Sequence, residues 1–358
     1  MEASVQELLR DFFHEANVPA ESTEIDLPLQ RLVEDVQSDS AVCKRDLRRL
    51  LEKDPNGFLQ SACRILRVSV GKAGVKPLLD LLWSSSLLLT SLIDPSLLSL
   101  PAAIALARRW VAFDRMLDIK LLQIAFPLGE EETVAAVDMG RRKRALDIVS
   151  GLPPDRHVLL ALAKLLRNPD GYIRSKAALL YARASRNPEW VRKMLAEPDA
   201  RIRANAVEGL WDTNSPFAAA LFREAALDPD HRVAANALIG LHHCGEAEGV
   251  LADLLENMVR SPNPMARRAA AFAIGHVRDA NCTATLEILL RDGDPGVRGE
   301  ALRALIAIRR EDRTEEAVDA PGTEGRPDSS GANEAAPPVD APPAAAPPVD
   351  ANVPVPAS

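Results

Sequence analysis

One twelve-residue pattern constrains this chain more than any other feature, because it recurs six times at nearly constant spacing. It begins with Asp or Asn, in most copies places a β-branched residue three positions later, and continues with Arg, Ala and Leu. The copies begin at Asp138, Asp170, Asp199, Asp230, Asn263 and Asp294. Successive starts lie 29 to 33 residues apart, and a repeat of this length predicts an all-α fold, an α-solenoid of stacked units.

The apolar spacing inside each copy predicts an α-helix. In the third copy Ile202 and Leu210 lie eight positions apart and share one helical face. Asp199 stands just before this helix, where its side chain can accept hydrogen bonds from free backbone N–H groups. Another apolar helical segment precedes each copy, for example Pro216–Ala226. We therefore expect about six pairs of antiparallel helices between residues 137 and 310.

The Asp, β-branched, Arg and Ala positions of the second helix in each pair resemble the HEAT-repeat family in its short bacterial, bilin-lyase-like form. The resemblance extends from about Asp138 to Ile308 and implies a polar ladder between neighbouring repeats. The ladder would use Asp170 with Arg174, Asp199 with Arg203, and Asp294 with Arg298. Two copies depart from the pattern, because Ala234 replaces the Arg and Asn263 replaces the Asp.

Composition and charge agree with stacked helix pairs. Hydrophobic residues make up 47% of the chain but aromatic residues only 4%. The net charge of −8 is uneven, with −5 in residues 1–136, +5 in residues 137–310 and −8 from residue 311 onward. Because a nucleic-acid-binding domain usually carries a much stronger basic field, nucleic acid is not an expected partner.

Residues 1–136 are expected to form an irregular helical region of divergent repeats. Its first helix, Val5–Ala16, has an apolar face, and the region as a whole would cover the exposed apolar end of the solenoid. Residues 81–107 form the most apolar stretch. Asp94 and two prolines interrupt it, so no membrane insertion is expected.

Residues 311–358 differ sharply from the rest of the chain. They consist mainly of Pro, Ala and acidic residues, and the sequence PPVDA occurs at residues 337–341 and again at 347–351. Such a segment buries too little apolar surface to offset the entropy lost on ordering. We expect a disordered tail with polyproline II character.

The sequence offers no catalytic or cofactor motif. It lacks a phosphate-binding loop, a dinucleotide fingerprint and a nucleophile elbow. HEAT-like metal-dependent hydroxylases use repeated His-Glu pairs as iron ligands, whereas His14-Glu15 is the single such pair here. The one cluster of soft ligands, His242-His243-Cys244, lies at a helix end with its side chains pointing in different directions. We expect no metal, no cofactor and no enzymatic activity.

Cysteine usage and the N-terminus indicate a cytoplasmic protein. The four cysteines stand at Cys43, Cys63, Cys244 and Cys282, and none forms a CxxC pair. Reduced thiols are therefore expected, and the first residues show no basic-then-apolar leader.

A candidate binding face follows from the helical phase of the second helices. Positions 2, 6 and 9 after the β-branched residue should point away from the core, toward the concave side. The candidates at positions 6 and 9 are Leu179, Glu208, Trp211, Ile239, His242, Phe272 and Arg303. Apolar side chains rimmed by charge commonly mark partner sites. The alternative is that repeat curvature or the chain's own tail covers these side chains.

These observations favour a non-catalytic scaffold that binds a protein or peptide on its concave face. The alternative is a nucleic-acid-binding protein that resembles the HEAT-like DNA glycosylases. It would use the basic run Arg141–Arg144 and Arg267-Arg268, together with Trp211 and Asp212. A continuous basic concave face would favour the alternative, and a mixed apolar and charged face would favour the scaffold.

Overall fold

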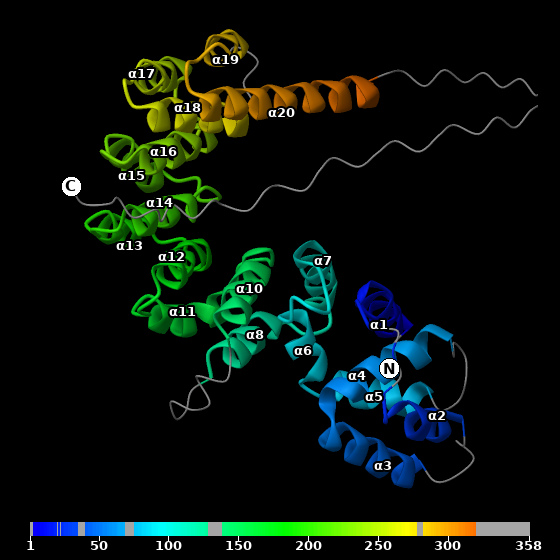
Figure 1. Ribbon diagram of the computed structural model, residues 1–358. Coiled ribbons are helices and arrows are strands. Elements are labelled where there is room, and N and C mark those ends of the chain that lie inside the picture. The colour runs from blue at the N-terminus through cyan, green and yellow to red at the C-terminus, as the bar shows by residue number, and fades with distance from the viewer. Residues whose placement is uncertain are drawn as a thin grey trace, which may run out of the picture. The chain divides into compact units, whose positions relative to one another are not determined.

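The computed structural model confirms the all-α prediction. It describes residues 3–19, 21, 23–34, 40–68, 75–127, 138–277 and 282–319. Every regular element in these ranges is helical (Figure 1). The chain divides into the units Met1–Glu311 and Asp312–Ser358. The last helix continues to Asp319, past the expected start of the tail at residue 311, and residues 320–358 of the predicted tail lie outside the described residues.

Eight helices precede α10 in the described part of residues 3–127. They are α1 (Ala3–Glu15), α2 (Asp26–Glu34), α3 (Ser40–Lys53), α4 (Pro55–Val68), α5 (Val75–Ser84), α6 (Leu87–Leu92), α7 (Leu100–Trp110) and α8 (Leu117–Ala125). The apolar face predicted for α1 packs against α4 and α7, with Leu8 and Phe12 fully buried. One hydrophobic cluster runs from Val5 into α12.

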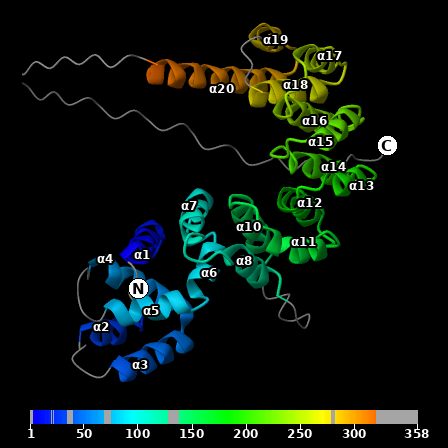
Figure 2. The ribbon, with the colours of Figure 1, turned by 180° about the vertical axis from the view of Figure 1, so that it is seen from behind.

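Helix pairs follow one another in chain order from α8 onward (Figures 1 and 2). The elements after α8 are α10 (Met139–Ser150), η1 (Arg156–Val158), α11 (Leu159–Leu165), α12 (Gly171–Ser185), α13 (Pro188–Met194), α14 (Ala200–Glu208), α15 (Pro216–Ala225), α16 (His231–His243), α17 (Glu248–Val259), α18 (Pro264–Val277), α19 (Thr283–Leu289) and α20 (Pro295–Asp319). The second helices of successive pairs pack together, α12 on α14, α14 on α16 and α16 on α18. This stacking confirms the solenoid.

The leading Asp or Asn of every copy caps the second helix of its unit, as predicted. The Asp170 carboxylate accepts hydrogen bonds from the backbone N–H groups of Tyr172 and Ile173. Equivalent bonds are made by Asp138, Asp199, Asp230, Asn263 and Asp294. Each bond satisfies a helix N–H group that has no partner within the helix, so the caps fix where the second helices begin.

An arginine ladder joins neighbouring units, but its partners differ from those predicted. Arg203 donates through Nε and Nη2 to both carboxylate oxygens of Asp228, at 2.9 Å each. Its Nη1 donates to the carbonyl oxygens of Glu197 and Pro198 in its own unit. Arg267 repeats this arrangement with Asp292. The guanidinium therefore ties the turn before its own helix to the turn of the next unit.

The predicted pairs within one copy are wrong, because the arginines donate to carbonyl groups of the turn before their own helix instead of to their own capping carboxylate. Arg174 lies 4.0 Å from Asp199 of the following unit and not against Asp170. Arg298 donates to the carbonyl oxygens of Asp292 and Gly293. The ladder thus exists: Arg298 binds the turn before its own helix, whereas Arg174, Arg203 and Arg267 also reach a carboxylate of the next unit.

A buried carboxylate and a histidine link α8 to the turn before α11. His157 Nε2 lies 2.6 Å from Asp118 Oδ1, and Nδ1 lies 3.0 Å from Asp155 Oδ1. Burial alone would lower the pKa of His157, but the two carboxylates outweigh burial and raise that pKa above its usual 6.5. Protonated His157 is therefore favoured in the folded state.

This shift predicts that stability depends on pH. Because the folded pKa of His157 lies above the unfolded value of about 6.5, its contribution is fully present below pH ~6.5 and is lost as pH rises through the folded pKa. The loss is about 1.4 kcal/mol for each unit by which the pKa is raised. Urea denaturation between pH 5.5 and 8.5 should show the wild-type protein losing stability relative to His157→Gln. A difference that stays constant with pH would contradict the prediction.

Candidate functional site

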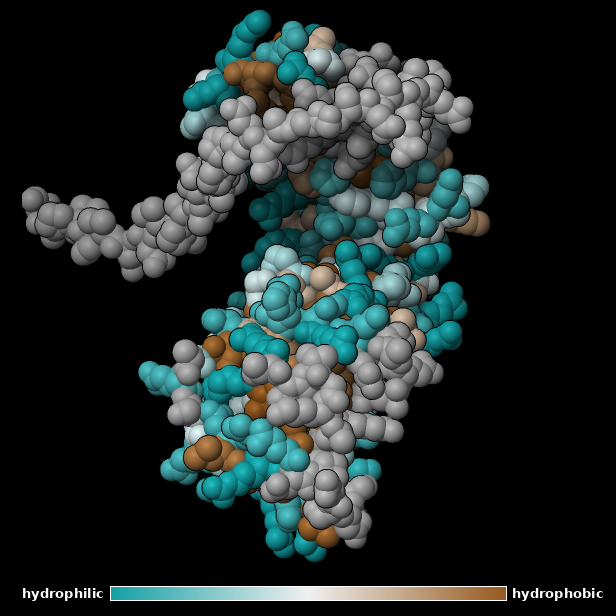
Figure 3. Space-filling model, turned by 90° about the vertical axis from the view of Figure 1, so that its right-hand side faces the viewer, coloured by the Kyte–Doolittle hydropathy of each residue, from teal (hydrophilic) through white to brown (hydrophobic). Residues whose placement is uncertain are grey.

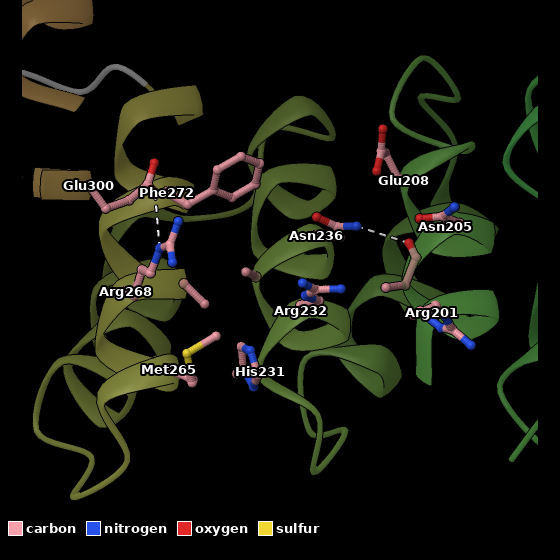
Figure 4. A pocket seen from close by; sticks show the side chains of 13 residues that line it. Arg201, Asn205, Glu208, His231, Arg232, Asn236, Met265, Arg268, Phe272 and Glu300 are labelled. Carbon is pink, nitrogen blue, oxygen red and sulfur yellow. Dashed lines mark hydrogen bonds and ion pairs between the residues drawn. The ribbon is translucent and has the colours of Figure 1, made fainter. Parts of the chain in front are cut away.

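A groove crosses the second helices α14, α16 and α18 and reaches α20 (Figure 4). Its volume is about 340 Å³. We call it the second-helix groove, and its walls include Arg201, Asn205, Glu208, His231, Arg232, Asn236, Met265, Arg268, Phe272 and Glu300. It is a concave surface of mixed polar and apolar character spanning four consecutive units.

Small side chains leave room for the groove. Ala204, Ala235 and Ala269 line it and are almost completely buried, so methyl groups face the groove where longer side chains would fill it. The helical phase brings further residues to the walls. Arg201 and Arg232 each stand one position before the β-branched residue, and Asn205 and Asn236 stand three positions after it. These positions follow the same helical face, one turn apart.

The two ends of the helices give the groove two different edges. In Figure 4, Arg201 and His231 lie toward the N-terminal ends of the helices, whereas Glu208 and Phe272 lie toward the C-terminal ends. Burial raises the pKa of Glu208, and the positive charges of Lys176 and Arg183 offset this only in part. One edge is thus rich in guanidinium groups and the other combines a carboxyl group with an aromatic ring.

Ion pairs hold several of these side chains in place. Arg201 donates to both carboxylate oxygens of Asp199, at 3.1 and 2.9 Å. Glu300 accepts from Arg268 at 3.2 Å and from Arg303 at 2.7 Å. Burial would raise the pKa of Glu300, but hydrogen bonds from the two arginines outweigh burial and lower it. Glu300 therefore stays ionised and neutralised within the groove wall.

An aromatic cluster closes the C-terminal edge. The Trp211 ring lies 5.6 Å from the His276 ring and 6.2 Å from the His243 ring. Phe272 packs against His276 at 4.2 Å between ring centroids. Trp211 Nε1 donates to the backbone carbonyl of Asn236 at 2.8 Å, so Trp211 links α14 to α16 while Phe272 faces the groove.

The predicted concave residues fall into three groups. Glu208 and Phe272 line the groove, and exposed Arg303 contacts the groove residue Glu300. Trp211 is half-buried beside it, and His242 lines a separate cavity of about 990 Å³ formed by α16, α17, α18 and α19. The remaining two, Leu179 and Ile239, are buried.

The expectation that Leu179 and Ile239 point away from the core is wrong. Leu179 is 6% exposed and Ile239 is 0% exposed. Gly209, directly after α14, packs onto the Leu179 carbonyl and Ala182, so the end of the neighbouring helix covers this part of α12. Ile239 belongs to the hydrophobic cluster of the later units. Position 6 therefore faces the groove in α14 and α18 but the core in α12 and α16.

The sequence prediction of the binding face left out Arg201, Arg232, Asn205 and Asn236, and it named Arg268 only for the nucleic-acid alternative. A polar residue recurs three positions after the β-branched position, at Lys176, Asn205, Asn236 and Glu300. This recurring polar position could have indicated the groove from the sequence. It lies on a helix face next to the core, where an ordinary buried face would carry apolar residues.

The basic run assigned to the nucleic-acid alternative serves structural contacts. Arg141 pairs with Asp94, and Lys143 lies 3.6 Å from Asp170. Arg144 is 9% exposed and donates to backbone carbonyl groups. These side chains do not form a free basic face.

The described ranges contain neither a candidate metal site nor a candidate membrane span. Within the described ranges, no group of three or more His, Cys, Asp or Glu side chains could hold a metal ion. The same ranges contain no helix with the length and apolar character needed to cross a bilayer. Cys63 is buried, while Cys244 and Cys282 are half-buried, and all three are free thiols.

Exposed apolar side chains outside the groove are scattered. On the face shown in Figure 3, hydrophilic side chains in teal interrupt the apolar ones in brown. In the regular units, the most exposed large apolar residues on the first helix of each pair or at its end are Leu160, Phe217, Leu227 and Ile288. Single exposed apolar residues are usual on folded proteins, so they serve as controls for the groove.

The comparison with protein families agrees with the architecture. Residues 250–320 match the family model for HEAT repeats. Human deoxyhypusine hydroxylase in complex with glycerol is similar at 16% sequence identity with a TM-score of 0.33, over 86% of this chain and 99% of that chain. An engineered protein is similar at 16% identity with a TM-score of 0.27, over the same shares. No curated protein sequence matches the chain. At these TM-scores the two structures carry no functional information here.

Proposed function

We propose that this chain, whose residues 250–320 match HEAT repeats, is a non-catalytic adaptor that binds an extended segment of a partner protein in the second-helix groove. The observation that carries the proposal is an open groove crossing four consecutive units. A solvated helix face would not combine recessed alanines, amide side chains and a half-exposed aromatic ring at one place.

Asparagine side chains in the groove suit an extended backbone. A bound segment without secondary structure brings unpaired N–H and C=O groups, which need partners when they leave water. Asn205 offers both an amide donor and an amide acceptor. Asn236 donates through Nδ2 to the Ala204 carbonyl at 2.9 Å, and this bond orients its Oδ1 as a fixed acceptor. The two amides lie on neighbouring helices.

Apolar contacts would supply the anchor. The Phe272 ring is half-buried and its position is set by His276. Met265, on the same helix, is 42% exposed in the groove. Aromatic side chains held in a partly formed pocket are common binding hot spots, so Phe272 is the expected anchor contact.

Nucleic acid is not part of the proposal. The groove walls carry Glu208 and Glu300 as well as arginines, and the run Arg141–Arg144 is engaged in contacts within the chain. A phosphate backbone needs positive charge along its whole path, which this mixed surface does not offer.

A peptide library tests the proposed function. We expect random twelve-residue peptides displayed on phage to yield binders whose affinity falls about 30-fold in the Asn205→Ala, Phe272→Ser double variant, equivalent to about 2 kcal/mol. The matched control is Phe217→Ser, Ile288→Ser, which changes exposed residues outside the groove and should leave affinity unchanged. Selected peptides that bind both variants equally would place recognition elsewhere and reject the proposal.

A further inference from the structure

We propose that the segment bound in the second-helix groove carries acidic side chains three residues apart, which pair with Arg201, Arg232 and Arg268. This inference rests on the proposed function and adds the chemistry of the partner. The three arginines belong to three consecutive second helices, α14, α16 and α18, and all line the same groove (Figure 4).

The three guanidinium groups retain hydrogen-bond donors. A guanidinium carries five N–H groups. Arg201 uses Nε and Nη2 for Asp199, and Arg268 uses Nε for Glu300. The side chain of Arg232 is exposed and makes no ion pair with any of the described residues. Guanidinium N–H donors therefore remain available on each of the three helices. Arg232, on the middle helix, has the largest number of available donors.

A carboxylate is the partner that such a side chain favours. Bonds between a guanidinium and a carboxylate are charge-assisted and frequently bidentate, which gives both energy and geometric specificity. Carboxylates of this chain already bind Arg201 through two such bonds and Arg268 through one. An acidic side chain on the ligand would complete the same arrangement at Arg232.

The distance between packed helices sets the spacing of the acidic residues. Arg201 and Arg232 occupy the same position of the repeat, and Arg268 lies three positions later in its own copy. Packed helices lie about 8–10 Å apart. A polyproline II segment rises about 3.1 Å per residue, so three residues span about 9.3 Å. A segment crossing the helices therefore presents one residue in three to each successive arginine, and the acidic residues should stand at positions i, i+3 and i+6.

The opposite edge favours a peptide over a phosphate polymer. Glu208 and Phe272 lie across the groove from Arg201. A nucleic acid carries a negative charge at every nucleotide and would bring some of that charge against Glu208. A peptide can instead place neutral or apolar residues between its acidic ones, where they would meet Phe272.

Fluorescence anisotropy with three labelled nine-residue peptides tests the inference. The first peptide is Asp-Ala-Pro repeated three times, the second has the same composition with its three Asp residues adjacent, and the third replaces Asp with Asn. We expect the first to bind at least about tenfold more tightly than the others. Arg232→Ala should weaken it about tenfold, and Arg232→Lys less. Arg291→Ala removes the same charge from an exposed residue outside the groove and should have no effect.

Four outcomes would overturn the inference. If the Asn peptide binds as tightly as the first peptide, acidic side chains are not required. If the peptide with adjacent Asp residues binds as tightly as the first, the three-residue spacing is not required. Equal losses for Arg232→Ala and Arg291→Ala would indicate attraction to overall charge. Competition by a single-stranded oligonucleotide at lower concentration than the first peptide would assign the site to phosphate. In each case the proposed function would still hold if a library-selected peptide binds the wild-type protein and loses affinity in the Asn205→Ala, Phe272→Ser variant. If no such peptide is found either, both the inference and the proposed function are rejected.

Discussion

Replacing Arg144 with methionine should lower the free energy of unfolding by about 4 kcal/mol, the largest effect expected from any single change considered. Arg144 is 9% exposed. It donates to the carbonyl oxygens of Leu92 at 3.0 Å, Leu98 at 2.6 Å and Ser99 at 3.2 Å. Methionine keeps much of the length and apolar contact of the side chain but removes every donor.

The cost arises from the carbonyl groups of buried Leu92 and Leu98, which lose their donor, whereas the Ser99 carbonyl still accepts from the backbone N–H of Ala103. A buried carbonyl without a partner costs about 1–3 kcal/mol, and Arg144 serves carbonyls at the end of α6 and the start of α7 from its place on α10. The side chain therefore joins the irregular N-terminal helices to the first regular unit. Loss of these bonds should loosen α6 and α7 before the later units.

Arg141→Met is the matched control on the same helix. Arg141 is 41% exposed in its side chain and pairs with Asp94 and Asp138 near the surface, and such pairs contribute about 0–1 kcal/mol. Urea denaturation followed by circular dichroism should separate the two variants clearly. Equal losses for both would show that the carbonyl contacts of Arg144 add little, contrary to the expectation.

Arg144 also shows where sequence analysis reaches its limit. In the sequence it is one of four consecutive basic residues, and a basic run predicts a solvated or anion-binding surface. The run lies on an α-helix, where consecutive residues point about 100° apart. One of the four therefore faces the core while Arg141 faces solvent, and charge alone does not indicate which.

The fold could be predicted because its determinants are local. Asp170 or Asp230 marks a helix start, since the cap needs an acceptor next to the first free N–H groups. The apolar residues that follow repeat with the period of a helix. Both features lie within twelve residues of sequence, and the structure places the second helices at these caps.

The binding face was harder to predict because it depends on how neighbouring helices cross. Leu179 and Glu208 occupy the same position of the repeat, yet Leu179 is covered where Gly209 packs onto α12. The apolar periodicity of α12 does not predict where α14 packs against it. The ladder partner of Arg203 was missed for a similar reason, because Asp228 looks like an ordinary turn residue two positions before the cap.

Replacing Asp228 with alanine should lower the free energy of unfolding by about 3 kcal/mol. The Arg203 and Asp228 side chains are 12% and 10% exposed, so the pair is largely shielded from solvent. Asp228 also accepts a hydrogen bond from the backbone N–H of Asp230 at 2.8 Å. The Asp228 carboxylate thus positions Asp230, the cap of α16, and binds Arg203 of the preceding unit.

The effect is large because the Asp228→Ala change leaves the shielded guanidinium of Arg203 without a carboxylate at this position. Its hydrogen bonds to the carbonyl groups of Glu197 and Pro198 remain. Asp228→Asn keeps an acceptor for Asp230 and for one N–H of Arg203, so we expect a smaller loss of about 1–2 kcal/mol. Asp253→Ala, which removes an exposed carboxylate from α17, should change stability by less than about 0.5 kcal/mol.

A double-mutant cycle isolates the pair itself. Because Arg203 and Asp228 contact each other directly, the losses in Arg203→Ala and Asp228→Ala should not add, and the coupling should reach about 1–3 kcal/mol. Additive losses would mean that the two side chains act independently and that apolar packing alone holds the units in line. A strong coupling would mean that the ladder fixes the spacing of α14 and α16, which is the spacing that the groove presents to its ligand. In that case Asp228→Ala should also weaken a groove-bound peptide, although Asp228 does not line the groove.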